Sequence, residues 1–218
     1  MALDEGVRVQ MAAIVERYPR SRSAVMPLLH LAQSAEGELT DEAMRIIADA
    51  LDLTTAEVAA VATFYTMYKR RPVGKHLIGV CTNTLCGLLG GDAVYDALSD
   101  RLGVGHDETT ADGMFTLERI ECQAACTHAP VMTVDWEFMD CQTPTSALDV
   151  VERLARGETV VSTRGPEIRD FEATEHTLAF PDDGLASQGG EADAMMLAGL
   201  RVAHELGMSA PPVPGQEP

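Results

Sequence analysis

The sequence predicts an α/β protein with a small helical bundle at its N-terminus and an acidic tail at its C-terminus. Helical apolar spacing runs to about residue 72 of the 218-residue chain, and strand-like and helical patterns then alternate over 73–157. Acidic residues, Pro and Gly are frequent in the remainder, 158–218. We therefore expect a helical region over 1–72, an α/β domain over 73–157, and a tail over 158–218 that is mostly flexible or docked on a partner.

The N-terminal region carries the signals of four helices. Amphipathic stretches over 7–18 and 24–35 predict the first two. Thr40 is suited to cap a third helix, whose first turn holds acids that the helix dipole favours. Thr54 and Glu57 form a capping-box pattern at the start of a fourth helix. Together these patterns predict a small helical bundle.

The middle of the chain alternates between strands and helices. The expected elements, in order, are a strand over 76–80, a helix over 93–102, a polar loop over 106–113, a strand over 115–120, short strands over 131–134 and 137–139, and a helix over 144–157. A strand–helix–strand unit followed by a strand–strand–helix unit is the arrangement of a small thioredoxin-like α/β sandwich.

The tail differs in composition from the rest of the chain. Residues 158–218 hold 11 acids and three arginines, and the last ten residues contain several prolines. A helix is expected over 192–206, with Met196, Leu200 and Ala203 on one side. This helix is compatible either with docking on a partner or with packing on its own domain.

Charge and hydropathy exclude several classes of function. A formal net charge of −18 argues against nucleic-acid binding and against adhesion to an anionic membrane surface. It is compatible with a basic patch on a partner protein, or simply with solubility. No apolar run approaches the ~18 residues of a membrane span. The N-terminus lacks a signal or transit pattern, so we expect a bacterial cytoplasmic protein without direct membrane insertion.

Four of the five cysteines form two close pairs, Cys81-x4-Cys86 and Cys122-x3-Cys126. Each pair follows an expected strand, and adjacent strands would bring both loops to one edge of a sheet. Four thiolates at one point are what a [2Fe–2S] cluster requires, and soft thiolates favour Fe–S, zinc or copper(I). The fifth residue, Cys141, stands apart and is expected to be a simple core or surface residue.

Three other interpretations of the cysteines remain open. Structural zinc takes four cysteines but usually in C-x2-C pairs, which are absent here. A thioredoxin-like dithiol enzyme also requires C-x-x-C, at the start of a helix. Buried structural cysteines are common, although two pairs in loops after strands are unusual for that role. The small polar residues between Cys81 and Cys86 favour backbone N–H groups that point at sulfur.

Between about residues 18 and 157 the sequence resembles the small [2Fe–2S] subunit of respiratory complex I, which is the E subunit of NADH-quinone oxidoreductase. The segments that carry the resemblance are Tyr18-Pro19, Phe64-Tyr65-Thr66, Gly74-Lys75-His76, Val80-Cys81-Thr82-Asn83-x-x-Cys86, Phe115-Thr116-Leu117, Glu121-Cys122-x-x-x-Cys126 and Ala129-Pro130-Val131. The resemblance implies a thioredoxin-like [2Fe–2S] ferredoxin domain behind N-terminal helices. It also implies that Cys81, Cys86, Cys122 and Cys126 are the cluster ligands.

The resemblance further implies partners and a location. The main partner would be the subunit that binds FMN and NADH, alongside other subunits of the peripheral arm on the cytoplasmic side of the bacterial inner membrane. The chain has no G-x-G-x-x-G and no Walker A motif, which fits FMN and NADH lying on the partner. One departure concerns Thr127 and His128, which stand where many relatives have glycine and an aromatic residue. Because it lies two residues after an expected ligand, His128 is compatible with contact to a sulfide or with Rieske-like ligation of iron. With four cysteines already present, a histidine that lies just outside the ligand set or is exposed is the simpler expectation.

Three functions are compatible with these residues. The first is an electron-transfer subunit of proton-pumping complex I. The second is the equivalent diaphorase subunit of an NAD-linked hydrogenase or formate dehydrogenase, which neighbouring genes would distinguish. The third is a free-standing ferredoxin. The helical N-terminal region and the aromatic run 64–68 argue against the third, because they are typical of a surface for permanent assembly.

Overall fold

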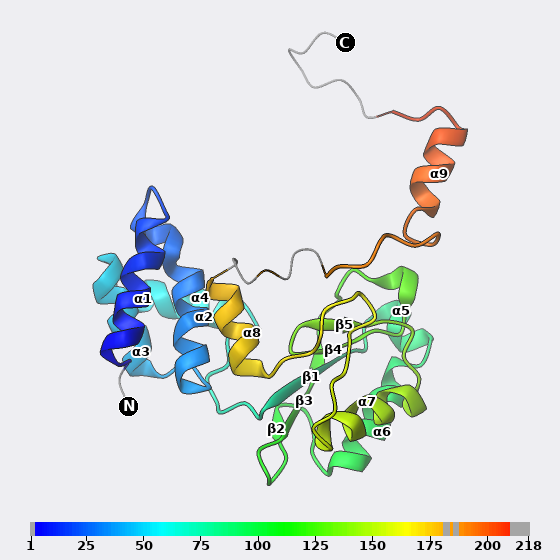
Figure 1. Ribbon diagram of the computed structural model, residues 1–218, viewed down its shortest axis with the longest axis horizontal. Coiled ribbons are helices and arrows are strands. Elements are labelled where there is room, and N and C mark those ends of the chain that lie inside the picture. The colour runs from blue at the N-terminus through cyan, green and yellow to red at the C-terminus, as the bar shows by residue number, and fades with distance from the viewer. Residues whose placement is uncertain (1–2, 181–183, 185–187, 210–218) are drawn as a thin grey trace.

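A computed structural model of the chain describes residues 3–180, 184 and 188–209 (Figure 1). The helices are α1 (Glu5–Glu16), α2 (Val25–Glu36), α3 (Asp41–Leu51), α4 (Thr55–Phe64), α5 (Thr84–Leu88), α6 (Gly91–Leu102), α7 (Pro144–Ala155), α8 (Phe171–Ala179) and α9 (Ala198–Glu205), with 3-10 turns η1 (Ser21–Ala24) and η2 (Cys126–His128). The strands are β1 (His76–Cys81), β2 (Glu108–Thr109), β3 (Phe115–Ile120), β4 (Met132–Val134) and β5 (Glu137–Met139).

Helices α1–α4 form the predicted bundle. Their apolar faces enclose a core of buried residues that includes Leu28, Leu29 and Ile47. The predicted caps are confirmed. The Thr40 hydroxyl accepts from the N–H of Ala43, and Thr54 with Glu57 forms a complete capping box.

The predicted strand and helix order of the α/β domain is confirmed, with two additions, the short helix α5 and the strand β2. The five strands lie in the order β2-β3-β1-β4-β5, and β1 and β3 are parallel while the other neighbours are antiparallel. The expectation of an unbroken polar loop over 106–113 is wrong, because Glu108 and Thr109 pair with β3. The Thr109 hydroxyl lies 2.7 Å from that of Thr116, a polar contact that favours pairing at this edge.

The two faces of the sheet are covered by different parts of the chain. Alternate residues of β1 and β3, including Ile78 and Leu117, pack with apolar residues of α6 and α7. The opposite face carries polar side chains, and Glu118 there meets Lys69 from the segment that follows α4. The helical bundle is therefore joined to the sheet through buried polar contacts as well as through the chain.

Residues 158–180 differ from the expected flexible tail. Val161 and Glu167 form an isolated β-bridge, and α8 lies beside α2 (Figure 1). Phe171 is 1% exposed and Glu175 is fully buried. The acid count suggested solvation, but Glu175 is satisfied by His30 and Trp136, and Phe171 supplies apolar burial. These contacts hold the segment against the body.

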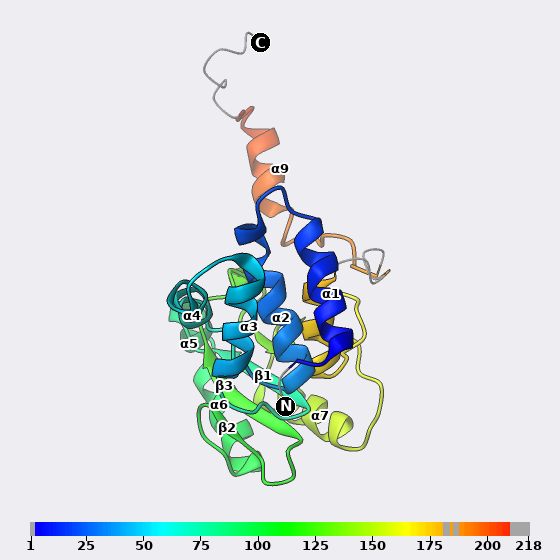
Figure 2. The same ribbon diagram turned by 90° about the vertical axis from the view of Figure 1, so that its left-hand side faces the viewer.

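The chain from α9 onward reaches away from the body. The helix expected over 192–206 is shorter, since turns occupy 194–197 and α9 begins at Ala198. α9 has no buried residue and projects from the rest of the molecule (Figures 1 and 2). Residues 210–218, where no regular packing was expected, lie outside the described part of the chain. Across residues 3–180, 184 and 188–209, no helix is long and apolar enough to cross a membrane.

Candidate iron–sulfur site

The first and third cysteines are brought together by the parallel pairing of β1 and β3. Cys81 is the last residue of β1 and pairs with Ile120, the last residue of β3. Cys122 follows two residues later. Parallel strands end at the same edge of a sheet. The loops that carry Cys81 and Cys122 therefore begin at the same edge, as expected from the sequence.

The second cysteine is held by a tight turn between α5 and α6. Cys86 lies in α5 and is buried. A Cβ atom on Gly91 would lie 2.5 Å from the carbonyl oxygen of Cys81 and 2.9 Å from that of Cys86. Only glycine allows this approach of backbone to backbone. Gly90, at φ 109°, provides the left-handed residue before α6.

The thiols of the two pairs interact with one another. The Cys86 thiol lies within hydrogen-bonding reach of that of Cys81 and also lies near that of Cys126. The Cys126 thiol, in η2, is hydrogen-bonded to that of Cys122 and also interacts with Cys81. The structure therefore places all four predicted ligands in one neighbourhood.

Two of the thiols are harder to ionise than an ordinary cysteine. Burial raises the pKa of the Cys86 thiol to about 11, and the hydrogen bond and charge of Cys81 add to this. The pKa of Cys126 is also raised, chiefly by its hydrogen bond with Cys122. Iron binding would displace these protons, since only thiolates ligate metal.

The donor set fits a two-iron cluster. Four thiols in two neighbouring pairs would offer two ligands to each iron of such a cluster. Within the described residues, no three His, Cys, Asp or Glu side chains lie close enough to hold a single metal ion. Cys81 and Cys86 are buried, whereas Cys122 and Cys126 are exposed.

Two hydrogen-bond donors point at the sulfur atoms. The backbone N–H of Val131 donates to Cys86, which fits the expectation of backbone donors. Asn83 Nδ2 lies 3.8 Å from Cys81 Sγ and 2.8 Å from the carbonyl oxygen of Ile120. The contact of the Asn83 side chain with sulfur was not specifically predicted, although Asn83 lies within the small polar loop that the sequence indicated. Such donors tune the potential of a bound cluster.

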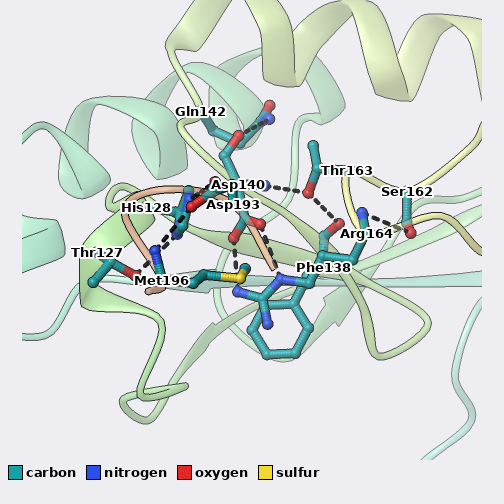
Figure 3. Close-up of polar contacts among 10 residues, drawn as sticks. All are labelled: Thr127, His128, Phe138, Asp140, Gln142, Ser162, Thr163, Arg164, Asp193 and Met196. Carbon is teal, nitrogen blue, oxygen red and sulfur yellow. Dashed lines mark hydrogen bonds and ion pairs between the residues drawn. The ribbon is translucent and has the colours of Figure 1, made fainter. Parts of the chain in front are cut away.

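The ring nitrogens of His128 and Trp136 pair with residues other than the four cysteines. The Nδ1 of His128 lies 2.9 Å from Thr127 Oγ1, and its Nε2 lies 2.7 Å from Asp193 Oδ2 (Figure 3). Both ring nitrogens are thus occupied, which agrees with a supporting role. The Nε1 of Trp136 donates to Glu175 at 2.8 Å. The sequence did not indicate Asp193 as a partner of His128, since the two residues are 65 positions apart in the chain.

Cys141 is separate from the thiol cluster. It is exposed, adopts φ 53°, and donates its backbone N–H to the carbonyl oxygen of His128. None of the interactions among the four other thiols includes it.

Residues 11–155 match the thioredoxin-like [2Fe-2S] ferredoxin family, which is two thirds of the chain. The chain belongs to this family, and the predicted fold class is confirmed. Among curated proteins, the chain is similar to the E subunit of NADH-quinone oxidoreductase from Mycobacterium tuberculosis, with 52% identity over 97% of this chain and 84% of the relative. It is also similar to the E subunit of NADH-quinone oxidoreductase from Rickettsia bellii, with 38% identity over 65% of this chain and 86% of the relative.

A solved structure shares the fold at lower identity. The crystal structure of an NAD+-reducing [NiFe]-hydrogenase in the air-oxidized state aligns with a TM-score of 0.55 at 20% identity. The alignment covers 62% of this chain and 23% of the hydrogenase chain. At that identity the likeness concerns the fold alone.

Proposed function

We propose that this chain is the electron-transfer subunit of an NADH-quinone oxidoreductase and that Cys81, Cys86, Cys122 and Cys126 hold its one [2Fe–2S] cluster. The observation that supports the ligand assignment is the nearness of the four cysteines at the end of β1 and β3, where the thiols of Cys86 and Cys126 are each influenced by other cysteines of the set. A bound cluster would supply one-electron redox chemistry. The chain itself contributes the thiolates, the donors to sulfur, and the buried side of the site.

The electron source that this function requires is reduced FMN on a partner subunit, which also binds NADH. Two observations support a partner that approaches from the cysteine edge. Cys122 and Cys126 are exposed there, and Leu88 and Leu89, which follow Cys86, are 79% and 55% exposed. Large exposed apolar residues beside a redox site are suited to a protein interface. Other peripheral-arm subunits would bind elsewhere, on the cytoplasmic side of the inner membrane.

A diaphorase subunit of an NAD-linked hydrogenase is the second candidate. The fold shared with the hydrogenase chain favours it, but the relative from M. tuberculosis matches nearly the whole chain at much higher identity. A formate dehydrogenase assembly would use the same chemistry. The third candidate, a free-standing ferredoxin, would not need a helical bundle for docking on a permanent partner.

Electron paramagnetic resonance tests the cluster and its ligands. The full chain would be purified anaerobically and reduced with dithionite. We expect a rhombic two-iron signal at low temperature that is lost in Cys86→Ala and Cys122→Ala. Cys141→Ala is the matched control and should keep the signal. A colourless protein that contains zinc would contradict the assignment.

Assembly tests the partner. The native protein should elute on size exclusion in a complex that contains flavin and a quinone-reducing membrane part. Elution with a hydrogenase or formate dehydrogenase large subunit would favour the second candidate. Elution as a single chain with an intact cluster would favour a free carrier.

A further inference from the structure

The loop that carries Cys126 is held from outside by the C-terminal segment. His128 is two residues after Cys126 and is 8% exposed, although it lies in a surface loop. Asp193, which lies before α9, contacts His128 from outside this loop (Figure 3). We call residues 188–193 the strap. They lie outside the 11–155 family match.

The strap is attached at two points. The backbone N–H of Gly190 donates to the carbonyl oxygen of Arg164 at 2.8 Å. Arg164 in turn forms two hydrogen bonds to Asp140, at 2.9 and 3.0 Å, and stacks 3.8 Å from the ring centre of Phe138. The first attachment is therefore to a rigid part of the domain next to β5.

The second attachment is Asp193, whose two carboxylate oxygens have different partners. Oδ2 lies 2.7 Å from His128 Nε2. Oδ1 accepts from the N–H groups of Met195 and Met196 at 2.8 and 2.9 Å. One side chain thus orders the turn before α9 and binds the ring that follows Cys126.

Two polar contacts fix the ring of His128. Its Nδ1 pairs with the Thr127 hydroxyl, and its Nε2 pairs with the Asp193 carboxylate. The carboxylate of Asp193 therefore lies directly against the loop that carries Cys126. The same loop is tied from the other side, since His128 accepts the N–H of Cys141 at its carbonyl oxygen.

We propose that Asp193 is a positioning residue for electron transfer: through His128 it fixes the loop of Cys126 and sets a negative charge beside the cluster. This inference rests on the proposed function. Reduction adds negative charge to a cluster that is already negative. A nearby fixed carboxylate therefore lowers the reduction potential, and the loss of its hydrogen bond frees the loop.

The test compares three variants of the full chain with its cluster in place. Asp193→Asn keeps a hydrogen-bond acceptor but removes the charge. Asp193→Ala removes both. Glu191→Gln is the matched control, because it removes the same charge from the same strap at an exposed residue two positions from Asp193.

We expect Asp193→Asn to raise the midpoint potential in a redox titration followed by electron paramagnetic resonance. Asp193→Ala should raise it as well, and should lose iron to a chelator several-fold faster than Glu191→Gln. Far-UV circular dichroism should be the same for all three. If neither Asp193 variant differs from Glu191→Gln in potential or in iron loss, the inference is wrong while the proposed function stands. A wild-type protein without a two-iron signal would overturn both.

Discussion

Lys69 and Glu118 form an ion pair between the segment after α4 and the sheet, with side chains that are only 12% and 6% exposed. Burial raises the pKa of the Glu118 carboxyl, and the Lys69 ammonium acts in the opposite direction. The pair joins the helical bundle to the face of β3 that lies opposite α6 and α7. The ammonium of Lys69 also lies 5.8 Å from the ring centre of Trp136.

Loss of Lys69 should therefore destabilise the whole chain. Lys69→Met leaves Glu118 buried without its partner, which typically costs about 3 kcal/mol. The double variant Lys69→Met/Glu118→Gln should recover part of this loss, because no unpaired charge remains. Urea unfolding at neutral pH would measure the free energy of unfolding of the single and the double variant. A single variant as stable as the wild type would show that the pair does not join the two parts.

His76 and Asp135 predict a specific pH dependence of stability. Asp135 Oδ2 lies 2.6 Å from His76 Nδ1, and Oδ1 accepts from the N–H of Leu77. Burial raises the pKa of the Asp135 carboxyl from 3.8 to about 6, although the hydrogen bond from His76 opposes this. Between about pH 4 and 6 the folded chain therefore holds a proton that the unfolded chain has released.

The free energy of unfolding should consequently fall as the pH rises from 4 to 6 through this group. Two pKa units correspond to about 3 kcal/mol as an upper bound. Asp135→Asn keeps the shape and cannot ionise, so the wild type should lose stability relative to this variant across the window. Denaturant titrations at pH 4, 5 and 6 would measure the difference. Parallel curves for the two proteins would contradict the prediction.

The segment 158–180 should be needed for stability, in contrast to the tail beyond it. Phe171→Ala should cost about 3 kcal/mol, the usual cost of removing a buried ring. A chain that ends at residue 157 should unfold at a lower temperature than one that ends at residue 187. Trp136 is the only tryptophan and donates to Glu175 of α8, so its fluorescence should report the loss of α8. Equal melting temperatures for both truncations would show that α8 does not stabilise the body.

Removal of iron should loosen only the cysteine edge. The two large cores are built from residues of the bundle and of the α/β sandwich. Cys81 and Cys86 belong to a small third cluster with Ile120, Ala125 and Val131. We expect faster hydrogen exchange over 82–90 and 121–131 after chelation, and little change in α2 and α3. Global unfolding of the iron-free chain would contradict this expectation.

Local signals in the sequence were sufficient for much of this protein. The caps at Thr40 and Thr54 act within one helical turn, and the apolar run of β1 and the alternation of β3 are also local. The spacing of the four cysteines and their place after strands were enough to indicate a common site. Each of these features depends on neighbours along the chain, so it can be recognised without a fold.

Only the tertiary structure decided the contacts between distant segments. The acids of residues 158–180 suggested a solvated tail, yet Glu175 is buried because His30 and Trp136, both far away in sequence, satisfy its carboxylate. Asp193 likewise acquires its position from His128. A buried charge is tolerated only when partners surround it, and those partners are defined by packing rather than by sequence spacing.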